Sequence, residues 1–73
     1  ADAEGVLREA LDIAGPSGPD RARVLSALAH VAYGRHRNSE ALGYIEQAID
    51  VARQSGAHEL VAAFSDTRRS WAS

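Results

Sequence analysis

Apolar side chains recur at three- and four-residue spacings in four separate segments of the chain, which is the pattern of amphipathic helices. This pattern predicts helices over about residues 2–14, 19–35, 39–55 and 58–71. The last segment is the least regular, since its outer half, residues 66–70, is polar. On the first predicted helix the apolar side consists of Val6, Leu7, Ala10, Leu11, Ile13 and Ala14. We therefore expect an all-α fold of antiparallel helix hairpins.

Glycine, proline and capping residues mark the ends of these segments. Residues 15–19 end the first helix and begin the second, because glycine accepts the left-handed terminal conformation and proline fits the first helical turn. Residues 34–38 form a turn short enough to lead only to an antiparallel neighbour. We expect Asn38 or Ser39 to cap the third helix with its side chain, and Gly56 to end it.

An internal repeat of 38 residues relates the first predicted helix to the third. Leu7, Leu11 and Ile13 return as Ile45, Ile49 and Val51. The identical pairs are Gly5 and Gly43, Ala10 and Ala48, Asp12 and Asp50, Ala14 and Ala52, Ser17 and Ser55, and Gly18 and Gly56. Repeats of this length are typical of stacked helical arrays, which present a surface to a partner.

The two helices within residues 22–53 resemble a tetratricopeptide repeat, in which large and small apolar residues alternate at fixed places in two antiparallel helices. The chain departs from that pattern at Ala32, where the family has an aromatic residue, and at Arg53, near a common closing proline. The matching positions are Leu25, Leu28, Ala29 and Ala32 in the first helix, and Ala41, Ile45 and Ala48 in the second.

The resemblance implies a right-handed stack in which residues 2–14 end a preceding repeat and residues 58–71 open a following one. The period of 38 residues exceeds the family's usual length of about 34, and such longer variants resemble the arrays of bacterial transcription regulators and signalling ATPases. In this family partners bind the concave side. By this resemblance the partner-binding residues are Arg23, Ser26, His30, Tyr33 and Arg69. The alternative is that these side chains are merely solvated.

Size and composition suggest a second kind of surface. A domain of 73 residues without cysteine depends on packing alone, and about three repeats are needed before a helical array is stable. The end helices should therefore expose apolar area, through which the chain forms a homodimer. The candidate self-association residues are Val6, Leu7 and Leu11 at one end, and Phe64 and Trp71 at the other.

Charge and targeting signals narrow the possible partners. The formal net charge of −2 argues against direct nucleic-acid or acidic-lipid binding, which needs a concentrated positive field. No apolar run reaches the roughly 20 residues of a membrane span and no signal segment is evident, so we expect a cytoplasmic protein. All 8 basic residues are arginine, a hint of bacterial origin, and the absence of methionine suggests a piece of a longer polypeptide.

Catalytic and metal-binding patterns are weak throughout. The three histidines, His30, His36 and His58, do not have the spacing that places two ligands on one helix face, so no metal or cofactor is expected. Glu46 and Asp50 lie one turn apart and could form an acid–base pair, the alternative being a solvated face. The sequence therefore predicts a non-catalytic protein–protein interaction domain, the sensing or scaffolding part of a bacterial regulatory protein. A small autonomous dimerisation module is the alternative.

Overall fold

A computed structural model describes residues 3–15 and 18–72 of the chain. Four helices account for most of them: α1 (Ala3–Ala14), α2 (Pro19–Gly34), α3 (Asn38–Gln54) and α4 (His58–Ala72). The described residues contain no strand. The expectation of an all-α chain with four helices is therefore confirmed, and each helix begins and ends within a residue or so of its predicted bounds.

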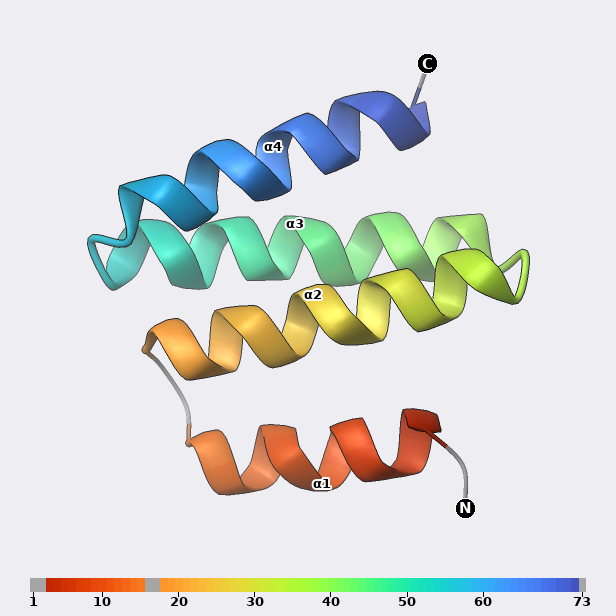
Figure 1. The fold of residues 1–73 in the computed structure, drawn as a ribbon, viewed down its shortest axis with the longest axis horizontal. Helices are drawn as coiled ribbons and strands as arrows, with labels where there is room; N and C mark the ends of the chain where they lie inside the picture. The colour runs from red at the N-terminus through yellow and green to blue at the C-terminus, as the bar shows by residue number, and fades with distance from the viewer. Residues whose placement is uncertain (1–2, 16–17, 73) are drawn as a thin grey trace.

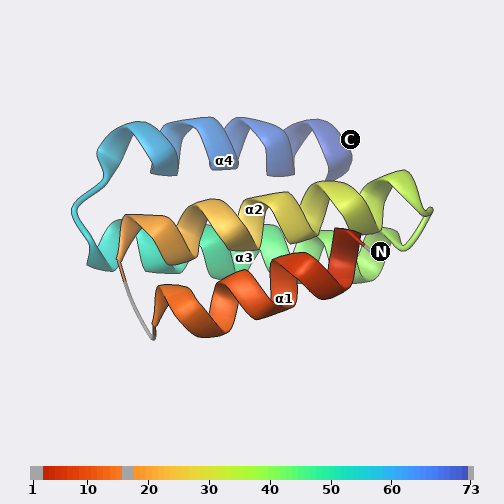
Figure 2. The ribbon, with the colours of Figure 1, turned by 60° about the horizontal axis from the view of Figure 1, so that its bottom comes forward.

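The helices lie side by side in chain order, and each runs antiparallel to the one before it (Figure 1). The molecule is a thin slab of 32 × 30 × 14 Å, with α1 and α4 at opposite edges (Figure 2). The most extensive interface joins α2 to α3, and α2 also touches α4. The two central helices are therefore covered on several sides, whereas α1 contacts only α2 among the other helices at the level of the backbone.

The core lies between α2, α3 and α4. All seven positions that the sequence pattern assigned to helix packing are buried, and Leu25, Leu28 and Ile45 are the largest fully buried side chains. Small residues such as Ala29 and Ala48, both 0% exposed, let the helix backbones approach closely around these larger side chains. The core cluster consists of Ala22, Leu25, Ala29, Ile45, Ala48, Ile49, Ala52 and Phe64.

The turn between α2 and α3 differs from the expected capping. Neither Asn38 nor Ser39 caps α3 with its side chain: Arg37 occupies the N-cap position and makes no side-chain capping bond. The turn is closed from the α2 side, because the Arg37 N–H donates to the carbonyl oxygen of Ala32 at 2.9 Å. His36 sits between them in the left-handed region, with φ of 63°. These backbone hydrogen bonds satisfy carbonyl groups at the end of α2, while the N-cap side chain of α3 makes no capping bond.

The apolar side of α1 is less buried than its pattern predicts. Val6 is 56% exposed, in agreement with an end helix that exposes apolar area, and Ile13 is 86% exposed although the periodicity places it on the apolar side of the helix. Leu7, Leu11 and the other members of that side are only half-buried. The physical reason is that one neighbouring helix covers a narrower arc of α1 than the apolar stripe occupies.

Charged side chains anchor the start of α1 to the α2–α3 turn. The Glu4 carboxylate lies 2.8 Å from Nη2 of Arg8, 3.0 Å from Nη1 of Arg35 and 3.7 Å from Nη1 of Arg37, and its side chain is only 12% exposed. A hydrogen bond to the Tyr44 hydroxyl and the nearby Glu4 charge raise the pKa of the Arg8 guanidinium. The Glu4–Arg8 ion pair is therefore part of a network that ties α1 to α2 and α3.

Candidate partner-binding surfaces

Aromatic side chains of α2 and α4 meet on one surface, which we call the aromatic face and define by His30, Tyr33 and Trp71. The rings of Tyr33 and Trp71 are stacked, with centroids 4.4 Å apart and planes at 8°. The His30 ring meets the same indole edge-on, at 5.1 Å and 73°. His30 and Tyr33 share one side of α2 because they are three residues apart, and the contact between α2 and α4 brings Trp71 to them.

The tautomer of His30 follows from its position on the helix. Its Nδ1 lies 2.8 Å from the carbonyl oxygen of Ser26, one turn earlier, and a carbonyl oxygen can only accept, so Nδ1 carries the proton. Ser26 itself is buried, at 8% exposure. The imidazole is thus oriented by its own helix while one of its edges faces Trp71. These contacts preorganise the aromatic face.

The remaining predicted partner-binding residues lie apart from the stacked rings. Arg23 pairs with Asp20 at 3.3 Å on α2, seven residues before His30 and therefore on the same side of the helix. Arg69 pairs with Asp66 at 3.4 Å and lines a different hollow, between α3 and α4. Both arginines are well exposed. The structure therefore groups His30 and Tyr33, places Arg23 on their side of α2, and separates Arg69 from them.

The residues predicted for self-association also divide into two groups. Phe64 is 8% exposed and belongs to the core cluster. The expectation that it lies at the surface is therefore wrong. Trp71 is half-buried because it packs on Tyr33. Val6 is exposed, and Leu7 and Leu11 are half-buried. Exposed apolar area is thus concentrated on α1. Ile13, which the sequence analysis did not propose for self-association, is 86% exposed, compared with 56% for Val6.

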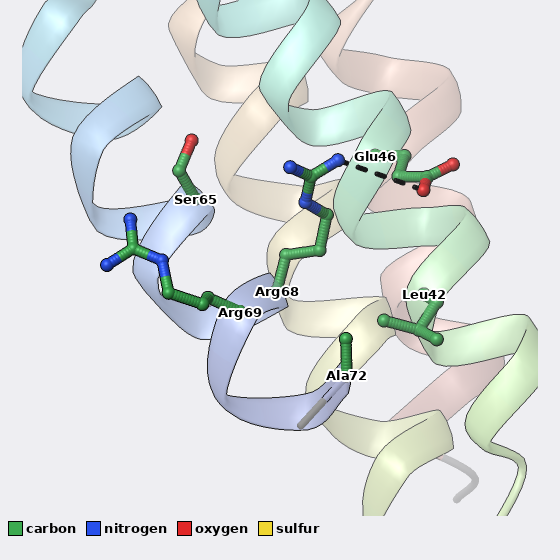
Figure 3. Close-up of a pocket in the computed structure, with 6 residues that line it drawn as sticks. All are labelled: Leu42, Glu46, Ser65, Arg68, Arg69 and Ala72. Carbon is green, nitrogen blue, oxygen red and sulfur yellow. Dashed lines mark ion pairs between the residues drawn. The ribbon is translucent and has the colours of Figure 1, made fainter.

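A groove of about 470 Å³ lies between α3 and α4 (Figure 3), and we call it the α3–α4 groove. Arg68 reaches across it from α4, with its Nη1 4.0 Å from the Glu46 carboxylate on α3, while the apolar side chains of Leu42 and Ala72 lie at one end. Sequence reasoning missed this groove because its residues come from two helices. Its full lining is Leu42, Glu46, Ser65, Arg68, Arg69 and Ala72.

The carboxylates of α3 do not form an isolated acid–base pair. Glu46 pairs with Arg68 on α4, and Asp50 pairs with Arg53 at 3.9 Å within its own helix. Both carboxylates are well exposed. A solvated face with exchangeable ion pairs describes this arrangement better than an acid and a base held in a dry site.

Across residues 3–15 and 18–72, no group of three or more His, Asp or Glu side chains is placed to hold a metal ion. The same residues include no helix that is both long enough and apolar enough to span a membrane. Every buried side-chain nitrogen and oxygen in this part of the chain has a hydrogen-bond partner. Among the surfaces of the described residues are the aromatic face, the α3–α4 groove and the exposed side of α1. Comparison of this chain with known protein families, with curated proteins and with solved structures found no match.

Proposed function

We propose that this chain is a non-catalytic protein–protein interaction domain, similar to tetratricopeptide arrays, which binds a segment of a partner protein on the aromatic face. The observation that carries the proposal is the stack of Tyr33 on Trp71, at 4.4 Å, on a surface where Tyr33 remains 41% exposed. Tyrosine and tryptophan are enriched among the residues that dominate binding energy, because a rigid ring buries much area at little entropic cost.

The chemistry around the rings favours a partner segment that combines an apolar anchor with a carboxylate. An apolar or aromatic side chain can pack on the exposed part of Tyr33, which the stack on Trp71 holds in place. Arg23, on the same side of α2, is paired with the exposed Asp20 and with no other residue that the structure describes, and such pairs contribute little stability. A partner carboxylate can therefore take the place of Asp20 at small cost.

We further propose that the chain is the sensing or scaffolding part of a bacterial regulatory protein in the cytoplasm. The 38-residue repeat and the arginine-only basic content support it, together with the resemblance of long-period repeats to the arrays of bacterial regulators. In that setting the domain holds a protein or peptide, and nucleic acid is contacted elsewhere.

The test uses a random peptide display library selected against the immobilised 73-residue chain. Selected peptides are titrated into the chain while the fluorescence of Trp71, its only tryptophan, is followed. We expect Tyr33→Ala to weaken binding at least about tenfold, as expected for a central ring at an interface, and His30→Ala to weaken it less.

Gln47→Ala, at an exposed position on α3, is the matched control and should bind as the unchanged chain does. Circular dichroism of each variant checks that the helices are intact. A library that yields no binder, or binders whose affinity is the same for Tyr33→Ala and the unchanged chain, would show that the aromatic face is not the binding surface.

A second candidate function is self-association, which the exposed apolar side chains of α1 favour. Val6 and Ile13 are 56% and 86% exposed, and both are aliphatic. Exposed aliphatic side chains on one helix side are typical of an interface that is covered in an assembly. Sedimentation of the chain over a range of concentrations tests this candidate, since a constant mass of 7.8 kDa would exclude it.

A further inference from the structure

The exposed apolar residues of α1 correspond, through the internal repeat, to residues that are covered on α3. We define the α1 strip as the exposed Val6 and Ile13 together with the half-buried Ala10 between them. Thirty-eight residues later its counterparts on α3 are Tyr44, Ala48 and Val51. Ala48 is 0% exposed, and the two larger counterparts are half-buried against the core. The same side of a related helix is thus packed in the middle of the slab and open at its edge.

The α3–α4 groove has the length that a helix such as α1 requires. It adjoins a second hollow of about 300 Å³, with which it shares Glu46 and Arg68. Together the two hollows follow α3 from Leu42 to Arg53, as many residues as the 12 of α1. Each helix runs antiparallel to the one before it (Figure 1). A helix docked beside α4 is therefore expected to run antiparallel to α4.

We propose that copies of this chain associate head to tail, with the α1 strip of one copy docked in the α3–α4 groove of the next. The docked α1 then follows α4 of the neighbouring copy as α3 follows α2 within a copy. This inference rests on the second candidate function, self-association, and specifies which two surfaces meet. It does not involve the stacked rings of Tyr33 and Trp71.

The two surfaces carry partly opposite charge, since Glu46 and Asp50 also line the two hollows but are outnumbered there by three arginines. Glu9 and Asp12 are exposed beside the α1 strip, and neither has an ion pair with any residue that the structure describes. The groove presents Arg68, which lies 4.0 Å from Glu46 in the longest ion pair of this part of the chain, and Arg69. A docked α1 brings two acidic side chains to these guanidinium groups while its aliphatic side chains cover the apolar part of the groove.

The positions of the two surfaces determine the kind of assembly. The helices α1 and α4 lie at opposite edges of the slab (Figures 1 and 2), so one copy can use both α1 and the groove beside α4 at once. Head-to-tail contacts of this type continue from copy to copy unless the rotation closes a ring. We therefore expect species larger than a dimer at high concentration, in contrast to the closed pair formed by a symmetric α1–α1 contact.

The experiment compares two variants, each of which blocks one surface. Ile13→Asp places a charge on the α1 strip, at a position exposed enough to leave the fold intact, and Arg68→Glu reverses the charge of the groove. Ile13→Leu and Arg68→Lys, which keep the apolar character and the positive charge respectively, are the matched controls for the two changes. Sedimentation velocity is measured from about 10 µM to about 1 mM, the range in which small interfaces associate. Circular dichroism confirms that every variant is helical.

We expect the unchanged chain and both controls to exceed the mass of the monomer as concentration rises, and each blocked variant alone to stay at 7.8 kDa. An equimolar mixture of the two blocked variants should form a pair of twice that mass, because one supplies an intact α1 and the other an intact groove. If Arg68→Glu alone still forms a dimer and mixing gives no new species, the head-to-tail proposal is wrong. The contact is then a symmetric one between two α1 helices. A monomeric unchanged chain at every concentration would exclude both forms of self-association.

Discussion

Replacing His36 by glycine should stabilise this protein. His36 has a left-handed backbone conformation, with φ of 63°, at the end of α2. The conformation is required by the turn, since the N–H of His36 donates to the Tyr33 carbonyl oxygen at 3.0 Å and the N–H of Arg37 donates to that of Ala32 at 2.9 Å. The α3–α4 turn is closed by the same pair of bonds, with Gly56 at φ of 72° in the equivalent place.

The magnitude follows from two opposing terms. An L-residue in the left-handed region costs about 1–2 kcal/mol, whereas glycine loses about 0.5–1 kcal/mol more backbone entropy on folding. The difference predicts a gain of about 0.5–1 kcal/mol for His36→Gly, or roughly 2–8 °C in Tm for a domain of this size. Gly56→Ala should lose a similar amount, because an added Cβ there meets no atom within 4 Å and only the backbone term applies.

Thermal and urea unfolding, followed by far-ultraviolet circular dichroism, measure both changes. His36→Ala is the control, since it removes the imidazole and keeps the left-handed strain, and we expect no gain in Tm from it. A gain from His36→Ala equal to that of His36→Gly would show that the side chain, and not the backbone conformation, is responsible. An unchanged or lower Tm for His36→Gly, alongside a loss for Gly56→Ala, would refute the reasoning.

Three further outcomes are expected. Ile45→Val should lower the free energy of unfolding by about 0.5–1.5 kcal/mol in urea titrations, since Ile45 is 0% exposed. In a double-mutant cycle, Glu4→Gln and Arg35→Gln should show a coupling of about 1 kcal/mol that shrinks with added salt, and zero coupling would contradict the 3.0 Å contact. Tyr33→Leu should remove the ring stack on Trp71, costing about 0.5–1.5 kcal/mol and changing the Trp71 emission spectrum, and an unchanged spectrum would argue against the stack.

Local pattern was sufficient for the helices and for most of the core. The apolar periodicity located α1 to α4, and the alternation of large and small residues identified Leu25, Ala29, Ile45 and Ala48 as packing positions. These inferences succeed because helix formation and the choice of a buried side depend on residues three and four apart. The same logic failed for Ile13, since periodicity defines an apolar side but not how many neighbouring helices cover it.

The candidate surfaces depended on contacts between residues distant in the chain. Sequence spacing placed His30 and Tyr33 on one side of α2, yet only the packing of α4 added Trp71 to them. The Glu4 network and the α3–α4 groove arise in the same way, from side chains of different helices. The sequence by itself determined four amphipathic helices and the inward sides of α2 and α3, because those follow from local hydrogen bonding and periodic burial. Tertiary structure alone decided which surfaces stay open, because exposure depends on where the neighbouring helices end.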